Sequence, residues 1–243
     1  CYNFGMSSPL VSVIIPSFNR FEYLLNAIES VSNQDYQNYE LIVVNDASSQ
    51  KEYYNYEFPK DLQKIDLTTS LKTKFGFATD AIRNEGAKIS KGKYLAFLDD
   101  DDVWLPNKLS MQVEALESSI CKFSSTEGYF GKGVYNENLD YPLYNEDRFF
   151  KKIKKRYKGS SYYRKFHYPE IWNLDFIKIH NCIITSSVMV DRELFLNIGG
   201  FRGLPNGIGD YDCWLALLNL SDLIYLDTPL FYYDGQHAEG RNY

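Results

Sequence analysis

The feature that most constrains this chain is an apolar segment that runs directly into four consecutive carboxylates. Residues 94–98 (Tyr-Leu-Ala-Phe-Leu) lack polar alternation, which predicts a strand buried on both faces. The four carboxylates that follow are Asp99, Asp100, Asp101 and Asp102. Like charges about 4 Å apart repel by roughly 1 kcal/mol in water and about 4 kcal/mol near a protein surface. The cluster therefore predicts either a helix N-terminus, which Asp caps and which Pro106 suits, or a hard cation such as Mg²⁺ or Mn²⁺ holding phosphate oxygens.

The first half of the chain alternates between strand and helix patterns. We expect strands at 10–15, 40–44, 64–67 and 94–98, the first ended by Pro16, and helices at 24–33, 76–90 and 106–118. This rhythm predicts an α/β fold with a parallel sheet and crossover helices. Ligands of such sheets bind outside the carboxyl ends of the strands. Polar clusters follow three of these ends, at 16–19, 45–46 and 99–102, so we expect them to converge on one crevice.

The second half is less regular. Residues 120–175 show little periodicity and contain a basic run from Lys151 to Lys158. A solvated helix face is one interpretation of this run. An anionic acceptor, a partner or a phospholipid surface, and hence a peripheral membrane contact, is the other. Beyond it the pattern predicts a strand at 182–190, a helix at 193–198 capped by Asp191 and ended by two glycines, a helix from Asp210, and a last strand at 223–226.

Composition excludes several classes of protein. A formal net charge of −6 argues against non-specific binding of nucleic acid. The 4 cysteines form no Cys-x-x-Cys pair, which makes a reducing, cytoplasmic location the expectation. No apolar run approaches the roughly 20 residues of a membrane span. We expect a single domain over 1–243, with a regular half at about 9–118 and a less regular half at about 119–243; the oligomeric state stays open.

Several segments together resemble the family 2 glycosyltransferases of the GT-A fold. The segments lie at 11–20, 40–48, 81–86, 94–109, 186–189, 199–201 and 209–214, in the family's order. The resemblance implies a Rossmann-like, mostly parallel sheet flanked by helices, with an irregular acceptor side. It also implies inverting transfer of a sugar from a nucleotide sugar, usually UDP-linked, to a hydroxyl of a glycan, lipid-linked or protein-linked acceptor, with Mn²⁺ or Mg²⁺ as cofactor.

The same resemblance implies roles for individual residues. Pro16, Phe18 and Asn19 would line the nucleoside pocket, Asp46 would accept a hydrogen bond from the uracil imide, and Arg83 would lie beside the diphosphate. In the Asp-x-Asp motif, Asp99 would touch the ribose or the metal and Asp101 would ligate the metal, with Asp100 in the nucleotide site and His237 able to complete metal or diphosphate binding.

Asp210 matches the family's catalytic base, and Asp212 is the fallback. Asp210 also suits the N-terminus of a helix, and Asp102 is expected to be a helix cap rather than a ligand. Two positions depart from the family: Gly209 stands where Glu is common, which affects acceptor contacts, and Asn45 stands where Asp is frequent.

Three other functions stay open at this stage. A sugar nucleotidyltransferase would carry a Gly-rich, basic loop after the first strand, where this chain has Pro16-Ser17-Phe18-Asn19. A catalytically silent domain that binds nucleotide or glycan would be favoured by loss of the Asp-x-Asp motif or of Asp210, and both are present. A Rossmann dehydrogenase would need Gly-x-Gly-x-x-Gly after the first strand, and that motif is missing.

Overall fold

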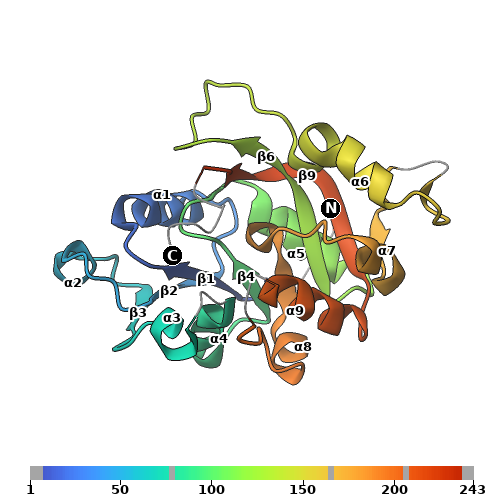
Figure 1. Cartoon of the computed structure of the whole chain (residues 1–243). Coiled ribbons are helices and arrows are strands. Elements are labelled where there is room, and N and C mark those ends of the chain that lie inside the picture. The colour runs from blue at the N-terminus through green and yellow to red at the C-terminus, as the bar shows by residue number, and fades with distance from the viewer. Residues whose placement is uncertain (1–7, 77–79, 164–166, 205–207, 237–243) are drawn as a thin grey trace.

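One mixed sheet runs through the whole described chain (Figure 1). The computed structural model describes residues 8–76, 80–163, 167–204 and 208–236. The sheet has the strand order β3-β2-β1-β4-β8-β6-β9-β5, and β7 pairs with β9. Its strands are β1 (Val11–Ser17), β2 (Tyr39–Asn45), β3 (Leu62–Asp66), β4 (Tyr94–Phe97), β5 (Val103–Trp104), β6 (Phe123–Gly131), β7 (Ile171–Trp172), β8 (Met189–Asp191) and β9 (Leu223–Asp234).

The strands of the first half of the chain pair in parallel, as the strand–helix rhythm predicts, and β6 and β9 of the second half also pair in parallel. β1 pairs in parallel with both β2 and β4, with Ser17 opposite Asn45 and Ile14 opposite Phe97. β8 pairs antiparallel with β4 and β6, and β5 and β7 pair antiparallel with β9. The expected α/β class is therefore confirmed: the long strand pairs are parallel, and short antiparallel pairs make the sheet mixed.

Helices cover the two faces of the sheet. The helices are α1 (Phe21–Ser32), α2 (Glu52–Asn55), α3 (Leu71–Phe75), α4 (Arg83–Ile89), α5 (Lys108–Glu117), α6 (Phe150–Arg156), α7 (Leu174–Ile179), α8 (Arg192–Asn197) and α9 (Gly209–Leu218), with a π-helix, η2 (Tyr144–Phe149), and short 3₁₀ turns η1 (Asp80–Ile82) and η4 (Thr185–Ser187). Alternate β1 residues serve the two faces: Val13 packs in a cluster with α1 and α5, and Ile14 in one with α4, α8 and α9. Both faces are thus buried, which explains the continuous apolar strands.

Two predicted boundaries in the first half were wrong. β1 continues through Pro16 to Ser17. The carbonyl of Ile14 accepts from Leu98, and Pro16 faces the same side two residues later, where β4 has already ended, so its missing N–H breaks no ladder. The helix expected from residue 76 does not begin there, because Gly76 (φ 81°) is the left-handed C-cap of α3.

The strand expected at 182–190 was also mostly wrong. Only β8 forms, after the η4 turn, because the hydroxyl of Ser187 donates to the carbonyl of Ile184 at 2.6 Å and so favours a turn. The predictions around it are confirmed: the carboxylate of Asp191 accepts from the N–H of Leu194 at the start of α8, and Gly199 and Gly200 have positive φ after its end. No helix in the described part of the chain combines the length and the apolar composition that crossing a bilayer requires.

Candidate active site

The three polar clusters meet at the carboxyl ends of β1, β2 and β4, as predicted. The hydroxyl of Ser17, the last residue of β1, donates to Oδ2 of Asp100 at 2.6 Å. The N–H of Asp46, just after β2, donates to the carbonyl of Ser17 at 2.9 Å. Adjacent parallel strands end at one edge of the sheet, so residues up to 83 positions apart in sequence share a single crevice.

The loop after β1 is held rigidly against the loop after β2. Asn19 has a positive φ of 53°, a conformation that Asn tolerates better than most residues. Its N–H donates to the hydroxyl of Ser48 at 2.9 Å, and its Oδ1 accepts from the N–H of Ser49 at 2.8 Å. Pro16 is buried in β1, and Phe18 is half-buried beyond it. Asn19 therefore shapes this loop with its own side chain.

Asn45, at the end of β2, is fully buried and fixes the second loop. Its Oδ1 accepts from the N–H of Ser48 at 3.0 Å, and its Nδ2 donates to Oδ1 of Asp66 at 2.8 Å. An aspartate could not donate the second of these bonds. This departure from the family pattern therefore has a structural reason inside this chain.

Two arginines from other elements offset part of the charge of the acidic cluster. Nη1 of Arg20 lies 3.1 Å from Oδ1 of Asp100 and 2.7 Å from Oδ2 of Asp101. Nη2 of Arg83 pairs with Oδ1 of Asp99. Four carboxylates thus face two guanidinium groups, and the cluster keeps an excess of negative charge. Arg20 was not predicted as a site residue.

Asp102 was expected to be a helix cap, and this was wrong. β5 follows it, and Asn107 rather than Asp102 occupies the N-cap of α5. Oδ2 of Asp102 accepts from the hydroxyl of Ser186 at 2.5 Å, and Oδ1 of Asp102 accepts from the N–H of Asp234 at 2.9 Å. The same Ser186 hydroxyl accepts from the N–H of Asp99 at 3.0 Å. Neither Ser186 nor Asp234 was predicted to support the site.

Three of the four carboxylates could hold one metal ion. Asp99, Asp101 and Asp102 each offer an oxygen, and the three oxygens lie within 4.8 Å of one another. Such separations fit a single ion with metal–oxygen distances of about 2.0–2.6 Å, and an all-oxygen donor set suits Mg²⁺ or Mn²⁺. The described residues therefore fit a divalent cation, with Asp102 in the third position. His237, the third ligand in the sequence prediction, lies outside the described residues.

The protonation of the cluster agrees with this fit. Burial raises the pKa of Asp100 to about 6, against the opposing charge of Arg20. Burial and then the charge of Asp100 raise the pKa of Asp101 to about 8, and burial with the charge of Asp101 raises that of Asp102 well above its usual range. Protons thus partly neutralise the carboxylates of the ion-free protein. Asp100 is only 1% exposed and faces Ser17 and Arg20, and its contact with a nucleotide stays a prediction.

Asp46 and Arg83 both lie beside residues of the crevice, Asp46 at Ser17 and Arg83 at Asp99. Oδ1 of Asp46 accepts from the N–H of Leu71 at the start of α3, at 2.7 Å, and burial raises the Asp46 pKa. Nη1 of Arg83 lies 3.0 Å from Oδ1 of Asp80, and its guanidinium lies 5.6 Å from the ring centre of Phe201. Arg83 is therefore held from three sides, by Asp80, Asp99 and Phe201.

Asp210 is the second residue of α9 and is half-buried. Its Oδ1 accepts from the N–H of Tyr211 at 2.5 Å, and Nδ2 of Asn181 lies 3.4 Å from its Oδ2. Burial first, and then the charge of Asp80, raises the Asp210 pKa to about 6. Asp212, the fallback base, instead makes a two-pronged ion pair with the exposed Arg202. Of the two carboxylates, Asp210 has the environment of a proton acceptor.

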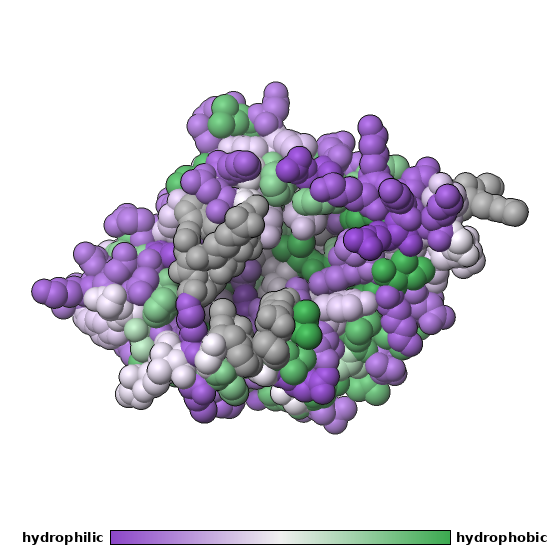
Figure 2. Space-filling model, in the orientation of Figure 1, coloured by the Kyte–Doolittle hydropathy of each residue, from purple (hydrophilic) through white to green (hydrophobic). Residues whose placement is uncertain are grey.

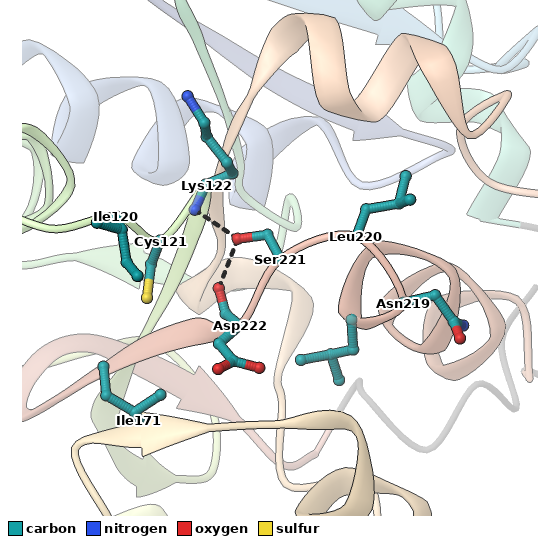
Figure 3. Close-up of a pocket in the computed structure, with 9 residues that line it drawn as sticks. Ile120, Cys121, Lys122, Ile171, Asn219, Leu220, Ser221 and Asp222 are labelled. Carbon is teal, nitrogen blue, oxygen red and sulfur yellow. Dashed lines mark hydrogen bonds between the residues drawn. The ribbon is translucent and has the colours of Figure 1, made fainter.

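A separate pocket lies at the other end of β6 and β9 (Figure 3). Its volume is about 510 Å³, and its lining includes Cys121, Ile171 and Leu220. The hydroxyl of Ser221 accepts from the N–H of Lys122 and donates to the carbonyl of Asp222. β6 and β9 both start here, whereas the carboxylate crevice lies near their far ends, beside Asp234. We therefore assign the chemistry to the crevice.

The comparison with known proteins agrees with this geometry. The family model described as glycosyl transferase family 2 matches residues 12–195. The chain belongs to this family. The putative teichuronic acid biosynthesis glycosyltransferase TuaG of Bacillus subtilis is 30% identical over 215 residues, which cover 86% of this chain and 72% of TuaG. The matched parts of two further curated bacterial glycosyltransferases span only 19% and 53% of their length.

Solved structures share the fold of this family 2 chain. S. aureus TarS residues 1–349, in complex with UDP-GlcNAc, align with a TM-score of 0.61 at 18% identity, over 93% of this chain and 58% of that one. The mannosyltransferase PcManGT of Pyrobaculum calidifontis, in complex with GDP-Man and Mn²⁺, aligns with a TM-score of 0.65 at 16% identity, over 96% of this chain and 60% of that one. At these identities the likeness establishes the fold, which is the expected GT-A architecture.

Proposed function

We propose that this chain catalyses the inverting transfer of a sugar from a UDP-sugar to an acceptor hydroxyl, with a divalent cation as cofactor. One observation carries the proposal. Arg83 pairs with Asp99 of the acidic cluster, and its charge also acts on Asp210, a half-buried carboxylate with a pKa of about 6. A cation site and a proton acceptor therefore share one crevice, as transfer between a diphosphate leaving group and a hydroxyl nucleophile requires.

The donor half, at about 9–118, would bind the nucleotide. Asp99, Asp101 and Asp102 would hold Mn²⁺ or Mg²⁺, which when bound would offset the charge of the departing diphosphate as a Lewis acid. Arg83 would add a positive charge beside the diphosphate. Pro16, Phe18 and the loop fixed by Asn19 would line the nucleoside pocket, where Asp46 would accept from the uracil imide. The nucleotide-sugar complexes of TarS and PcManGT support such a donor.

The acceptor half, at about 119–243, would supply the chemistry of the attacking hydroxyl. Asp210 would accept its proton, because a carboxylate with a pKa of about 6 is mostly ionised at pH 7 yet is a stronger base than an ordinary aspartate. The alkoxide that forms would attack the anomeric carbon from the side opposite the diphosphate, and the configuration would invert. The similarity to TuaG, a putative glycosyltransferase of teichuronic acid biosynthesis, supports a glycan acceptor.

The proposal also includes a binding partner for the basic run from Lys151 to Lys158. Lys151, Lys152, Lys155, Arg156 and Lys158 are all exposed, while Ile153 and Tyr157 of the same segment are buried. α6 lies at the upper right of Figure 1, and the same region of Figure 2 is strongly hydrophilic. We infer that this face meets an anionic surface, such as a phospholipid bilayer, while the crevice works on the acceptor.

The decisive test of this function is Asp210→Asn. The amide keeps the size of the side chain and an oxygen for the N–H of Tyr211, but it cannot take a proton. Turnover should fall by about 10²–10⁴-fold, the usual contribution of a positioned base. Affinity for the UDP-sugar should change little, since the proposed donor contacts lie in the other half. Release of UDP, with or without a glycan acceptor, measures the rate, and calorimetry measures the affinity.

Asp212→Asn is the matched control on the same helix, since Asp212 points to Arg202. It should keep most of the activity. Near-normal transfer by Asp210→Asn would exclude Asp210 as the base. Loss of donor affinity in parallel with rate would instead give Asp210 a structural or donor-site role.

A further inference from the structure

The carboxylate of Asp80 lies beside Gly209, where the side chain of any other residue would press against it. A Cβ atom on Gly209 would lie only 2.8 Å from Oδ2 of Asp80 and 3.3 Å from the carbonyl oxygen of Arg202. Gly209 is buried and is the first residue of α9, where glycine costs backbone entropy on folding. Its φ is not in the left-handed region, so the backbone alone does not require glycine. Glycine is explained by the space that the Asp80 carboxylate takes.

The other oxygen of Asp80 holds Arg83. Oδ1 of Asp80 accepts from Nη1 of Arg83 at 3.0 Å, while Nη2 of Arg83 binds Asp99. The two ends of the guanidinium fork are thus directed to two carboxylates from different elements. Arg83 is buried, and Asp80 is part-exposed, with 23% of its side chain open to solvent. Asp80 therefore closes the side of Arg83 that faces the start of α9.

Asp210 is the next residue after Gly209, so the same arrangement decides which charges it meets. The charged groups that act on it include Asp80 and Arg83; Tyr144 of η2 and Cys213 of its own helix also interact with it, but burial raises the pKa of each and keeps it neutral, and Asn181 adds a neutral amide. Asp80 favours a proton on Asp210, and Arg83 disfavours it. If Asp80 lost its charge, Arg83 would lose one of the two carboxylates that fix its position relative to Asp210.

We propose that Asp80 is a positioning residue for the base assigned to Asp210: seated against the bare backbone of Gly209, it keeps Arg83 on Asp99 and away from Asp210. The inference rests on the proposed function for the role of Asp210, but the arrangement of charges it describes can be measured in the resting protein. In this arrangement Arg83 serves the diphosphate side of the crevice, and Asp210 keeps the proton affinity of a base. Asp80 itself touches no reacting atom.

The test is a titration of the Asp210 carboxyl by ¹³C NMR in EDTA, with Asp210→Asn used to assign the signal. Asp80→Asn removes the charge but keeps an oxygen for Arg83, and it should lower the Asp210 pKa by about one unit. Gly209→Ala should do the same by displacing the Asp80 carboxylate. Glu85→Gln is the control, since it removes a carboxylate from the adjacent helix that pairs with the exposed Lys88, and it should leave the titration unchanged.

An unchanged Asp210 pKa in Asp80→Asn would overturn the inference, whatever the outcome for Gly209→Ala. In the enzyme assay, the acid limb of the pH profile of kcat/KM should move to lower pH in Asp80→Asn by the same amount, while KM for the donor stays within about twofold. The proposed function can fail separately. If Asp210→Asn keeps its activity while Asp80→Asn still shifts the titration, the charge arrangement stands and the base is elsewhere.

Discussion

At the scale of single residues, Ser186 shows how one hydroxyl can organise a charged site. It accepts from the N–H of Asp99 and donates to Oδ2 of Asp102, so it bridges the first and last residues of the acidic cluster. Its carbonyl also accepts from the indole of Trp104 at 2.8 Å. A buried donor or acceptor without a partner costs about 1–3 kcal/mol, and this network leaves neither Asp99 nor Asp102 in that state. Ser186 therefore sets the spacing of two candidate metal ligands.

Asp46 offers a prediction at the same scale, because its two oxygens have different tasks. Oδ1 accepts from the N–H of Leu71, and the proposal assigns the other oxygen to the uracil imide. In Asp46→Asn the N–H of Leu71 should keep the amide oxygen, which turns the NH₂ group toward the base. That group opposes the imide N–H of uracil but can donate to the ring nitrogen of cytosine. The UDP-to-CDP affinity ratio should fall by about 10–150-fold, equivalent to 1.5–3 kcal/mol.

Calorimetry with both nucleotides, in Mn²⁺, measures this ratio. Asp66→Asn is a suitable control, since Asp66 is the last residue of the adjacent strand β3 and pairs with Asn45 and Lys64. The proposed recognition of the base by Asp46 would be contradicted if Asp46→Asn had the same UDP-to-CDP affinity ratio as the unmodified protein.

At the scale of elements, the regular half of the chain was predictable and the irregular half was not. The strands β1, β2 and β4 can be recognised in the sequence as apolar runs, because both of their faces are buried. β6 gives no such signal. Its residues Ser124, Ser125 and Glu127 are buried but polar, and each is paired inside the protein: Ser125 with Ser187 at 2.7 Å, and Glu127 with the N–H groups of Gly128 and Asn145. A strand whose polar residues face inward cannot be found from hydrophobic periodicity.

The candidate site follows the same division. Strand ends made the convergence of Ser17, Asp46 and Asp99 predictable, because parallel order alone brings them together. Asp102, Ser186 and Asp234 were not predictable as a group. Their contacts depend on the mixed second half of the sheet, where β9 brings Asp234 to the end of β5 and η4 turns Ser186 toward Asp99. Patterns along the chain carry no information on such pairings.

The α6 helix carries the prediction that belongs to this scale. Within the described residues, none of the cations from Lys151 to Lys158 forms an ion pair. A lysine near an anionic bilayer contributes about 1 kcal/mol of binding. Replacing Lys151, Lys152 and Lys155 by Glu should therefore lower binding to vesicles containing phosphatidylglycerol by about 100-fold or more. Cosedimentation with such vesicles and with neutral ones measures the effect.

A triple variant of equal charge change serves as the control. Lys51, Lys60 and Lys91 are also exposed but lie in the donor half. Their replacement by Glu should weaken binding much less, as a general effect of net charge. Equal losses in the two triple variants would show that total charge, rather than the α6 face, drives the contact.

At the scale of the whole molecule, a single sheet couples donor and acceptor sides. β8 pairs with β4 on one side and β6 on the other, so the strand that ends in the acidic cluster and the strand that leads into the acceptor half share one partner. Asp102 adds a second link, because its Oδ1 binds the N–H of Asp234 at the end of β9. A cation at Asp99, Asp101 and Asp102 would therefore tie the two halves together, and its binding should stabilise the entire fold.

That stabilisation should depend on pH, and its sign follows from the raised pKa values. Asp101, with a pKa of about 8 in the ion-free protein, holds a proton that the unfolded chain would release near pH 4. Its contribution to the free energy of unfolding is therefore full at low pH and is lost as the pH rises through 8. A divalent cation replaces the proton, so the increase in Tm that Mn²⁺ gives over EDTA should be larger at pH 7.5 than at pH 5.5. At 100 times its Kd the ion should add about 2.7 kcal/mol.

Comparing Mn²⁺ with EDTA at each pH cancels the titration of groups far from the cluster, such as His180, whose pKa is lowered by burial. Asp101→Asn should remove both the ligand charge and the titrating proton, so Mn²⁺ should raise its Tm little at either pH. Differential scanning calorimetry in dilute buffer gives the four values needed for each protein. An equal increase in Tm at pH 5.5 and pH 7.5 in the parent would mean that the ion binds without displacing a proton, and hence at carboxylates other than Asp101.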